Sequence, residues 1–363
     1  MQKYSIEKTL GTGAFGDVFR ASLRTDPSEL VAIKKIKQKY SSWKECLHLR
    51  ELASLKVLRH TNIVRLKEMI LEKELLHFVF EFCDGNLYEE MKKAPFSRER
   101  IQLSMRQIFA GLSYMHKQGY FHRDMKPENV LIKDGVLKLA DFGLAREVRS
   151  RPPYTQYVST RWYRSPELLL RSPAYNSPVD IWACACIMAE LFMNVPLFAG
   201  QSEVDMLMKI FMACGAPNKQ SWPDGVPLLK TRGITSLPER TVGLESMTKN
   251  CVPADAMDLM KMCMTLDPAR RASGAAALKH PFLDINEVEL QRVVSSSQLK
   301  KKLSSNLVFS SDSSKEGKNA DSGMSKTASS KTTEAKLTES KLDDTVDTDD
   351  LNALLDEMME GKH

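Results

Sequence analysis

The chain has 363 residues, a formal net charge of +6 and a hydrophobic fraction of 42%, which together predict a globular protein with a sizeable core. Its seven cysteines are scattered through apolar stretches, which argues against a disulfide framework or a zinc site. The first residues lack the apolar core of a signal peptide, and the longest apolar run, 181–189, is too short to span a bilayer. No basic stretch alternates with aromatics, so a nucleic-acid partner is not expected. We expect a reduced, cytoplasmic protein without membrane insertion.

Residues 1–84 predict a small β-rich lobe with one helix. The helical spacing of Cys46, Leu49, Leu52 and Val57 predicts a helix over 42–58. Short β-rich runs separated by turn signals predict strands at 4–11, 16–23, 30–37, 63–70 and 75–82.

After a linker at 81–85, residues 85–285 predict a larger helical lobe, with the clearest helix over 98–116. The fold class is therefore α+β with two lobes. Residues 286–342 are rich in Ser, Thr and Lys and poor in large apolar residues, which predicts a disordered tail. Residues 343–363 are acidic, and Thr348 can cap a short helix there, which either docks or forms only transiently.

Three glycines, Gly11, Gly13 and Gly16, form a G-x-G-x-x-G pattern between two predicted strands. Glycine lets a backbone approach phosphates and offer them its N–H groups, although three glycines in a turn can also be only a turn. A dinucleotide site would need a helix directly after the glycines. Because a strand pattern follows, a dinucleotide site is disfavoured.

Lys34 ends the motif VAIK on the third predicted strand. An ammonium beneath the glycine loop can pair with the α- and β-phosphates of a nucleotide. Glu51, in the predicted helix, can hold that lysine in position. Either residue alone would be interpreted as surface charge.

The string HRDMKPEN, from His122 to Asn129, carries three candidate groups. Asp124 can orient an acceptor hydroxyl and take its proton, and Lys126 can neutralise charge on a transferring phosphoryl group. Asn129 can hold Mg²⁺. The alternative is a solvated polar loop after a helix, which this eight-residue pattern makes improbable.

The string DFG, from Asp141 to Gly143, follows another strand pattern. Asp141 can bind Mg²⁺ that bridges the β- and γ-phosphates, while packing of Phe142 sets an active or inactive state. Each motif alone could arise by chance. In this order they match the signature set of protein kinases.

With these motifs in view, residues 4–282 resemble the eukaryotic protein kinases. The stretch YVSTRWYRSPELLL is similar to the proline-directed (CMGC) group. SSWKECLHLREL, SRPPYTQYVSTRWYR and SPVDIWACACIMAELFMNVPLFAGQSEVDMLMKI resemble the male germ cell-associated and intestinal cell kinase (RCK) family. The resemblance implies a serine/threonine kinase that uses ATP and Mg²⁺ on protein substrates, with a link to cilia or flagella. A nuclear location stays open.

The resemblance also implies roles for individual residues. The catalytic set is Asp124, Lys126, Lys34 and Glu51, and the metal ligands are Asn129 and Asp141. The ATP site comprises Leu10, Gly11, Thr12, Gly13, Ala14, Phe15, Gly16, Val18, Ala32, Lys34, Phe80, Glu81, Cys83 and Leu131. Leu55, Leu66, His122 and Phe142 form a column anchored by Asp180, and Glu167 pairs with Arg271.

Regulation and specificity follow from the same resemblance. Thr155 and Tyr157 are expected phosphorylation sites, although Gln156 between them replaces the aspartate usual in the family and leaves the upstream kinase open. Arg50, Arg123 and Arg146 would form the phosphate pocket. The pocket for the substrate residue after the target comprises Val158, Ser159, Thr160 and Arg164. It implies Ser-Pro or Thr-Pro targets, because proline brings no N–H that would lack a partner. We expect a monomer.

The two alternative functions are a scaffold and a kinase for small molecules or lipids. A scaffold with an inactive kinase fold would act through its tail, but Lys34, Glu51, Asp124, Asn129 and Asp141 are all present. A kinase for small molecules or lipids is disfavoured by the complete peptide-binding segment 160–167.

Overall fold

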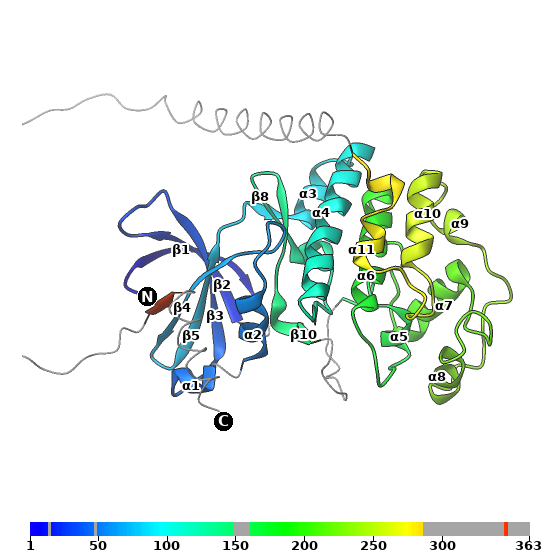
Figure 1. Cartoon of the computed structure of the whole chain (residues 1–363), viewed down its shortest axis with the longest axis horizontal. Helices are drawn as coiled ribbons and strands as arrows, with labels where there is room; N and C mark the ends of the chain where they lie inside the picture. Colours follow the sequence, from blue (N-terminus) through cyan, green and yellow to red (C-terminus); the bar gives the residue numbers. More distant parts are fainter. Residues whose placement is uncertain (14–15, 47–48, 148–159, 286–344, 348–363) are drawn as a thin grey trace, which may run out of the picture.

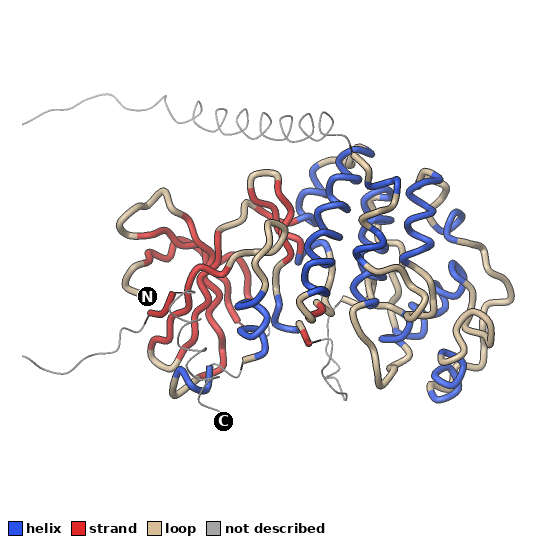
Figure 2. The backbone as a smooth tube through the Cα atoms, in the orientation of Figure 1, coloured by secondary structure: helices blue, strands red, loops and turns tan. Residues whose placement is uncertain are grey.

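The computed structural model describes residues 1–13, 16–46, 49–147, 160–285 and 345–347. Figures 1 and 2 show the strands gathered in one lobe and most helices in the other. The predicted α+β fold with a β-rich N-lobe and a helical C-lobe is therefore confirmed.

The N-lobe is built on one sheet whose described strands run in the order β1-β2-β3-β5-β4-β11. All neighbours are antiparallel, and the register places Val18 opposite Lys34 and Ala32 opposite Phe80. The strands are β1 (Tyr4–Thr12), β2 (Gly16–Leu23), β3 (Leu30–Lys39), β4 (Leu66–Glu72), β5 (Leu75–Glu81) and β11 (Thr345–Asp347).

The apolar pattern of β3 decides which of its side chains face each side of the sheet. Val31 and Ile33 are buried in a small cluster on one face of the sheet. Because successive side chains of a strand point to opposite faces, Ala32 and Lys34 point away from that cluster. Both candidate ATP-site residues of β3 therefore share the other face.

The predicted single helix over 42–58 is wrong in detail. The structure has two helices, α1 (Trp43–Cys46) and α2 (Arg50–Val57), and Leu49 before α2 is extended, with φ −69° and ψ 125°. Cys46 and Leu52 are both fully buried. Both helices therefore contribute to the core, although the predicted helix is interrupted between them.

The fourth predicted strand, 63–70, begins later than expected, at Leu66. Before it, the backbone turns to the other lobe: the N–H of Val64 donates to the carbonyl of Leu139 at 2.9 Å, and Leu139 N–H donates to Asn62 at 2.9 Å. Hydrogen bonds to the C-lobe thus replace the strand pairing that the apolar run predicted.

The C-lobe is organised around two long helices that pack on each other. α4 (Arg98–Lys117) confirms the clearest predicted helix, and the Ser97 hydroxyl caps its first turn. α6 (Pro178–Met193) is buried along nearly its whole length. The remaining described helices are α3 (Leu87–Lys93), α5 (Pro166–Leu169), α7 (Glu203–Cys214), α8 (Gly225–Thr231), α9 (Leu244–Met247), α10 (Ala254–Cys263) and α11 (Gly274–Ala277).

Short strands and 3₁₀ turns carry the motif residues at the lobe boundary. One small sheet joins β6 (Gly85–Asn86), β8 (Val130–Lys133) and β9 (Val136–Leu139), and another joins β7 (Tyr120–Phe121) and β10 (Arg146–Glu147). The 3₁₀ turns are η1 (Pro127–Asn129), η2 (Phe142–Leu144) and η3 (Pro281–Leu283).

The strand β11 was not predicted. It pairs with the edge strand β4 in antiparallel register, Thr345 opposite Ile70 and Asp347 opposite Glu68 (Figure 1). The predicted helix beginning at Thr348 and the predicted disordered tail 286–342 lie outside the described residues.

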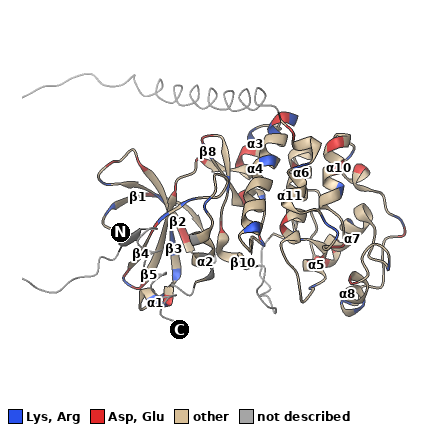
Figure 3. Cartoon of the chain, in the orientation of Figure 1, with Lys and Arg blue, Asp and Glu red and all other residues tan. Residues whose placement is uncertain are grey.

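The mixed charge of the sequence and its lack of long apolar runs are reflected in the described elements. Acidic and basic residues are interspersed on the described elements of both lobes (Figure 3). Of the helices that the structure describes, none combines the length and apolar character needed to cross a bilayer.

Candidate active site

The loop after β7 is fixed to the buried carboxylate of Asp180 on α6. Asp180 Oδ2 accepts hydrogen bonds from His116 Nε2 and the His122 N–H, both at 2.8 Å, and Oδ1 accepts from the Arg123 N–H at 2.8 Å. Burial opposes ionisation, but these donors outweigh it and hold the pKa of Asp180 below its ordinary value. The start of HRDMKPEN is thus held rigidly by the core of the C-lobe.

Asp124, Lys126 and Asn129 are brought together by this loop. Lys126 Nζ donates to Asp124 Oδ2 at 2.8 Å. Asn129 Nδ2 donates to the Asp124 carbonyl at 2.8 Å and to its Oδ2 at 3.1 Å. The side chains of Asp124 and Lys126 are 11% and 19% exposed. The Asp124 carboxylate thus keeps a small exposed area while Lys126 and Asn129 hold it in place.

Lys34 and Asp141 join the two lobes. Lys34 Nζ lies 3.2 Å from Asp141 Oδ1. Desolvation raises the pKa of Asp141, but the charge and hydrogen bond of Lys34 outweigh it and leave the pKa below its ordinary value. Asp141 has the left-handed backbone conformation, with φ 64°. Such strain in a non-glycine residue is typical of functional sites. Because its pKa is lowered, the Asp141 carboxylate remains ionised near neutral pH and can bind a cation.

The predicted metal ligands fit Mg²⁺ chemically. Both amide N–H contacts of Asn129 go to Asp124, so the amide oxygen is the group through which Asn129 would bind a cation. Asp141 adds a carboxylate that is 45% exposed. Mg²⁺ prefers oxygen ligands and is commonly held by one or two protein groups together with substrate phosphates.

The glycines of the loop serve two different purposes. A Cβ at Gly16 would lie 2.3 Å from the Lys35 carbonyl oxygen, so β2 and β3 can approach only with glycine there. No such contact surrounds Gly11, and the nearest atom to a Cβ at Gly13 would be 3.6 Å away. The described packing around these two glycines leaves room for a side chain, and the approach of a ligand to them stays a prediction. Ala14 and Phe15 lie outside the described residues.

The residues expected around adenine come from both lobes. Leu10 and Thr12 lie on β1, Val18 on β2, Ala32 on β3, Phe80 on β5 and Leu131 on β8. Glu81 ends β5, and Cys83 lies in the linker that follows. The structure thus places these residues on four N-lobe strands, the linker and β8, and their contact with ATP stays a prediction.

The expected structural contacts are present. The rings of His122 and Phe142 lie 5.4 Å apart, and both residues are buried. Leu55 and Leu66 are buried in the same core. Arg271 binds Glu167 through two hydrogen bonds, at 2.7 and 3.0 Å. The buried ion pair is confirmed, as are the His122–Phe142 contact and the Asp180 anchor of the column; the stacking of Leu55 and Leu66 in that column stays a prediction.

The activation segment is the part of the predicted site that the structure describes only in part. Thr155, Tyr157, Val158 and Ser159 lie outside the described residues, as do the side chains of Glu51, Arg50 and Arg146. Arg123 donates to the Leu144 carbonyl and to the Tyr175 hydroxyl. Thr160 and Arg164 line one cavity together with Asp124.

The sequence model of one protein family, described as the protein kinase domain, matches residues 4–283. The chain belongs to the protein kinase family. Cyclin-dependent kinase F-3 of Oryza sativa subsp. japonica is 46% identical over 287 residues, which cover 78% of this kinase and 66% of the relative.

Two mouse relatives confirm the predicted likeness to the male germ cell-associated and intestinal cell kinases. Serine/threonine-protein kinase MAK of Mus musculus is 46% identical over 291 residues, which cover 79% of this chain and 46% of the relative. Serine/threonine-protein kinase ICK of Mus musculus is 46% identical over 288 residues, which cover 78% and 46%. The matched part thus spans about half to two thirds of the length of these relatives.

Sequence reasoning missed two features of this kinase domain. The Lys34–Asp141 pair joins residues far apart in the chain, and no local pattern marks it. Arg123, with φ 74°, and Asp141 both adopt left-handed conformations. Glycine adopts such a backbone freely, and aspartate, like asparagine, is enriched there, so Asp141 gives a weak signal and Arg123 gives none.

Proposed function

We propose that the chain is a protein serine/threonine kinase that transfers the γ-phosphate of ATP, with Mg²⁺, to Ser-Pro or Thr-Pro sites. The observation that carries the proposal is the hydrogen-bonded set of Asp124, Lys126 and Asn129 on a loop held by Asp180. These groups can act on a hydroxyl, a phosphoryl group and a metal ion within one small volume.

The chemistry assigns one role to each group. The substrate hydroxyl oxygen forms a bond to the γ-phosphorus while the bond from that phosphorus to the oxygen that bridges the β-phosphate breaks. Asp124 orients the hydroxyl and accepts its proton, and Lys126 offsets negative charge on the transferring group. Mg²⁺, held by Asn129 and Asp141, would neutralise charge on the phosphates. ADP leaves with the former bridging oxygen.

Proline specificity rests on Arg164 and the segment before it. We expect this segment to offer no acceptor for the N–H of the substrate residue after the target. A buried N–H without a partner costs about 1–3 kcal/mol, and proline has none. A peptide series with proline or alanine at that position should show transfer falling about tenfold or more with alanine. Equal transfer to both would contradict the specificity.

The test of the activity is transfer of labelled phosphate to a Ser-Pro peptide. The wild-type chain should transfer phosphate only with Mg²⁺ and ATP, and Asp141→Asn should lose most of this activity while its thermal unfolding stays close to that of the wild type. Binding of ATP without transfer in any phosphorylation state would favour the scaffold instead.

Activation is proposed to need phosphate on Thr155, with Tyr157 as a second site. A phosphate brings nearly two negative charges and several acceptor oxygens to Arg123 and its predicted neighbours Arg50 and Arg146. Thr155→Ala should lower activity far more than it lowers stability. Equal activity of phosphorylated and unphosphorylated chains would remove this switch.

From the resemblance we also propose that this kinase acts in the cytoplasm and at a cilium or flagellum, as a monomer activated by another kinase. A fluorescent fusion of the full chain should then concentrate along the axoneme of ciliated cells. A uniform distribution would contradict the ciliary part of the proposal.

A further inference from the structure

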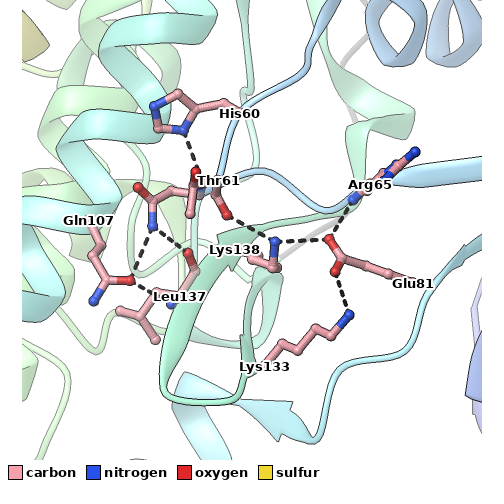
Figure 4. A network of polar contacts seen from close by, with 9 residues as sticks. His60, Thr61, Arg65, Glu81, Gln107, Lys133, Leu137 and Lys138 are labelled. Carbon is pink, nitrogen blue, oxygen red and sulfur yellow. Dashed lines mark hydrogen bonds and ion pairs between the residues drawn. The ribbon is translucent and has the colours of Figure 1, made fainter. Parts of the chain in front are cut away.

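A buried carboxylate lies where β5 passes into the linker between the lobes. The backbone around Glu81 is expected to meet adenine, but its side chain extends to other partners (Figure 4). Glu81 Oε1 accepts from the Arg65 N–H and pairs with Lys138 Nζ, both at 2.9 Å. Glu81 Oε2 accepts from Lys133 Nζ at 2.9 Å. Both oxygens are therefore satisfied by donors outside the linker.

These contacts differ from an ordinary surface ion pair. The side chains of Glu81 and Lys138 are 8% and 12% exposed, whereas that of Lys133 is 38% exposed. Desolvation opposes ionisation of Glu81, but hydrogen bonds from the two lysines outweigh it and keep the pKa of its carboxyl below the ordinary value. Charges at this depth interact more strongly than solvated ones, and loss of one partner leaves the other unpaired.

The partners of Glu81 belong to a network that joins the lobes. Lys138 also donates to the Thr61 carbonyl at 2.9 Å, in the segment between α2 and β4. The neighbouring Asn62 amide donates to Leu137 O at 2.9 Å and to Gln107 Oε1 on α4 at 3.1 Å. Figure 4 shows these contacts as one continuous set. The hairpin β8–β9 is thereby attached both to Glu81 at the start of the linker and to residues 61–62.

The far end of the linker is held on the same hairpin. The Asp84 N–H donates to the Ile132 carbonyl at 2.7 Å, and its Oδ2 accepts from the Asp134 N–H at 3.1 Å. Two residues later, in β6, Asn86 pairs with Leu131. Leu131 is the residue expected to form one wall of the adenine site. The linker is thus attached at both ends to the hairpin that carries this wall.

We propose that the Glu81 carboxylate is a positioning group for the purine base, because it fixes the linker backbone relative to Leu131. The inference rests on the proposed function only in taking a purine nucleotide as the ligand. The groups expected to meet phosphates, Lys34 and Asp141, pair with each other, whereas the Glu81 carboxylate binds Arg65, Lys133 and Lys138. Loss of the carboxylate should therefore weaken binding of the base and leave binding of the phosphates unchanged.

The experiment compares two probes on the full chain by calorimetry: adenosine, which lacks phosphates, and magnesium tripolyphosphate, which lacks a base. Glu81→Gln should weaken adenosine binding roughly tenfold, the effect of leaving a buried donor or acceptor unpaired. Lys138→Met should weaken it similarly. Tripolyphosphate binding should change by less than about twofold in both variants. Lys209→Met, which removes an ion pair with Asp205 on α7, is the matched control and should change neither.

Two results would overturn the proposal: adenosine binding unchanged in Glu81→Gln, or equal weakening of both probes. If Glu81→Gln does not fold, Lys133→Met replaces it and should also weaken adenosine binding but not tripolyphosphate binding, because Glu81 Oε2 loses its donor; this more exposed partner can be removed while Lys138 still pairs with Glu81. Adenosine binding unchanged in that variant too would overturn the proposal. A wild-type chain that binds neither probe would contradict the proposed function itself. A wild type that binds both, with variants that match it, would remove only the role of Glu81.

Discussion

Arg271 is a buried charge whose donors are all directed at named acceptors. Besides Glu167, it donates to the carbonyls of Thr265 at 2.9 Å, Leu266 at 3.2 Å and Pro178 at 2.9 Å. The side chains of Arg271 and Glu167 are 0% and 2% exposed. Such a pair is costly to form, since both ions lose their hydration, but far costlier to break on one side.

We therefore expect Glu167→Gln to lower the free energy of unfolding by about 3–5 kcal/mol, because a buried guanidinium loses its counter-charge. Arg271→Met should cost a similar amount, and the double variant Glu167→Met with Arg271→Met less than the sum. Urea unfolding measures all three. Glu245→Gln, in an exposed pair with Lys261, is the control and should cost about 1 kcal/mol or less. Additive single losses would show that the two residues act independently.

At the scale of elements, the catalytic loop depends on α6 through one carboxylate. Asp180 receives three donors, two of them backbone N–H groups of the loop. An asparagine there would turn an NH₂ group toward at least one N–H donor. The loop would then have to shift, and with it Asp124.

Asp180→Asn should therefore lower kcat by about 100-fold, the effect of a displacement of about 1 Å in catalytic groups. Steady-state kinetics with a Ser-Pro peptide measures it, and the KM for ATP should change little, because Asp180 does not touch the nucleotide site. A fall in kcat below about threefold would show that the loop tolerates the loss.

The same residue predicts a pH dependence of stability. A carboxyl whose pKa is lowered on folding stabilises the protein above its unfolded pKa, about 3.9 for Asp. This contribution is lost as the pH falls through the lower folded pKa of Asp180. The wild type should thus exceed Asp180→Asn in unfolding free energy from pH 7 down to about pH 4, and the difference should shrink only below it. Closure of the difference near neutral pH would contradict a lowered pKa.

The sequence predicted those elements that local patterns define. The strands β1, β2 and β3, the helix α4 and the motif order were read from periodicity, turn residues and spacing. The break before α2 was not, because the helical period continues through it. The detour at Val64 was not, because its partner Leu139 lies on another element. The same holds for Glu81: its neighbours in sequence give no sign of Lys133 and Lys138, which only the folded hairpin brings to it.

At the scale of the whole molecule, residues 345–347 pair with the N-lobe sheet. The edge strand β4 would otherwise present unpaired N–H and carbonyl groups, which natural sheets usually protect. Residues 345–347 cover part of that edge. The register sets Asp347 opposite Glu68, which Lys3 and Tyr4 already contact. Three residues supply only a short ladder, in which each hydrogen bond contributes about 0.5–1.5 kcal/mol, so this docking is expected to be marginal and readily reversed.

Proline substitutions test whether β11 forms in solution. Successive N–H groups of a strand point to opposite sides, so of Thr345→Pro and Val346→Pro at least one must remove a donor directed at β4. That variant should speed hydrogen exchange of the outward-facing amides of β4 roughly fivefold, which corresponds to loss of about 1 kcal/mol for a hydrogen bond. Ala335→Pro adds the same residue elsewhere in the tail and should have no effect. If neither strand variant changes exchange in β4, the edge is open in solution. If exchange depends on protein concentration, the strand comes from a second copy, because a tail in its own chain acts at a fixed effective concentration.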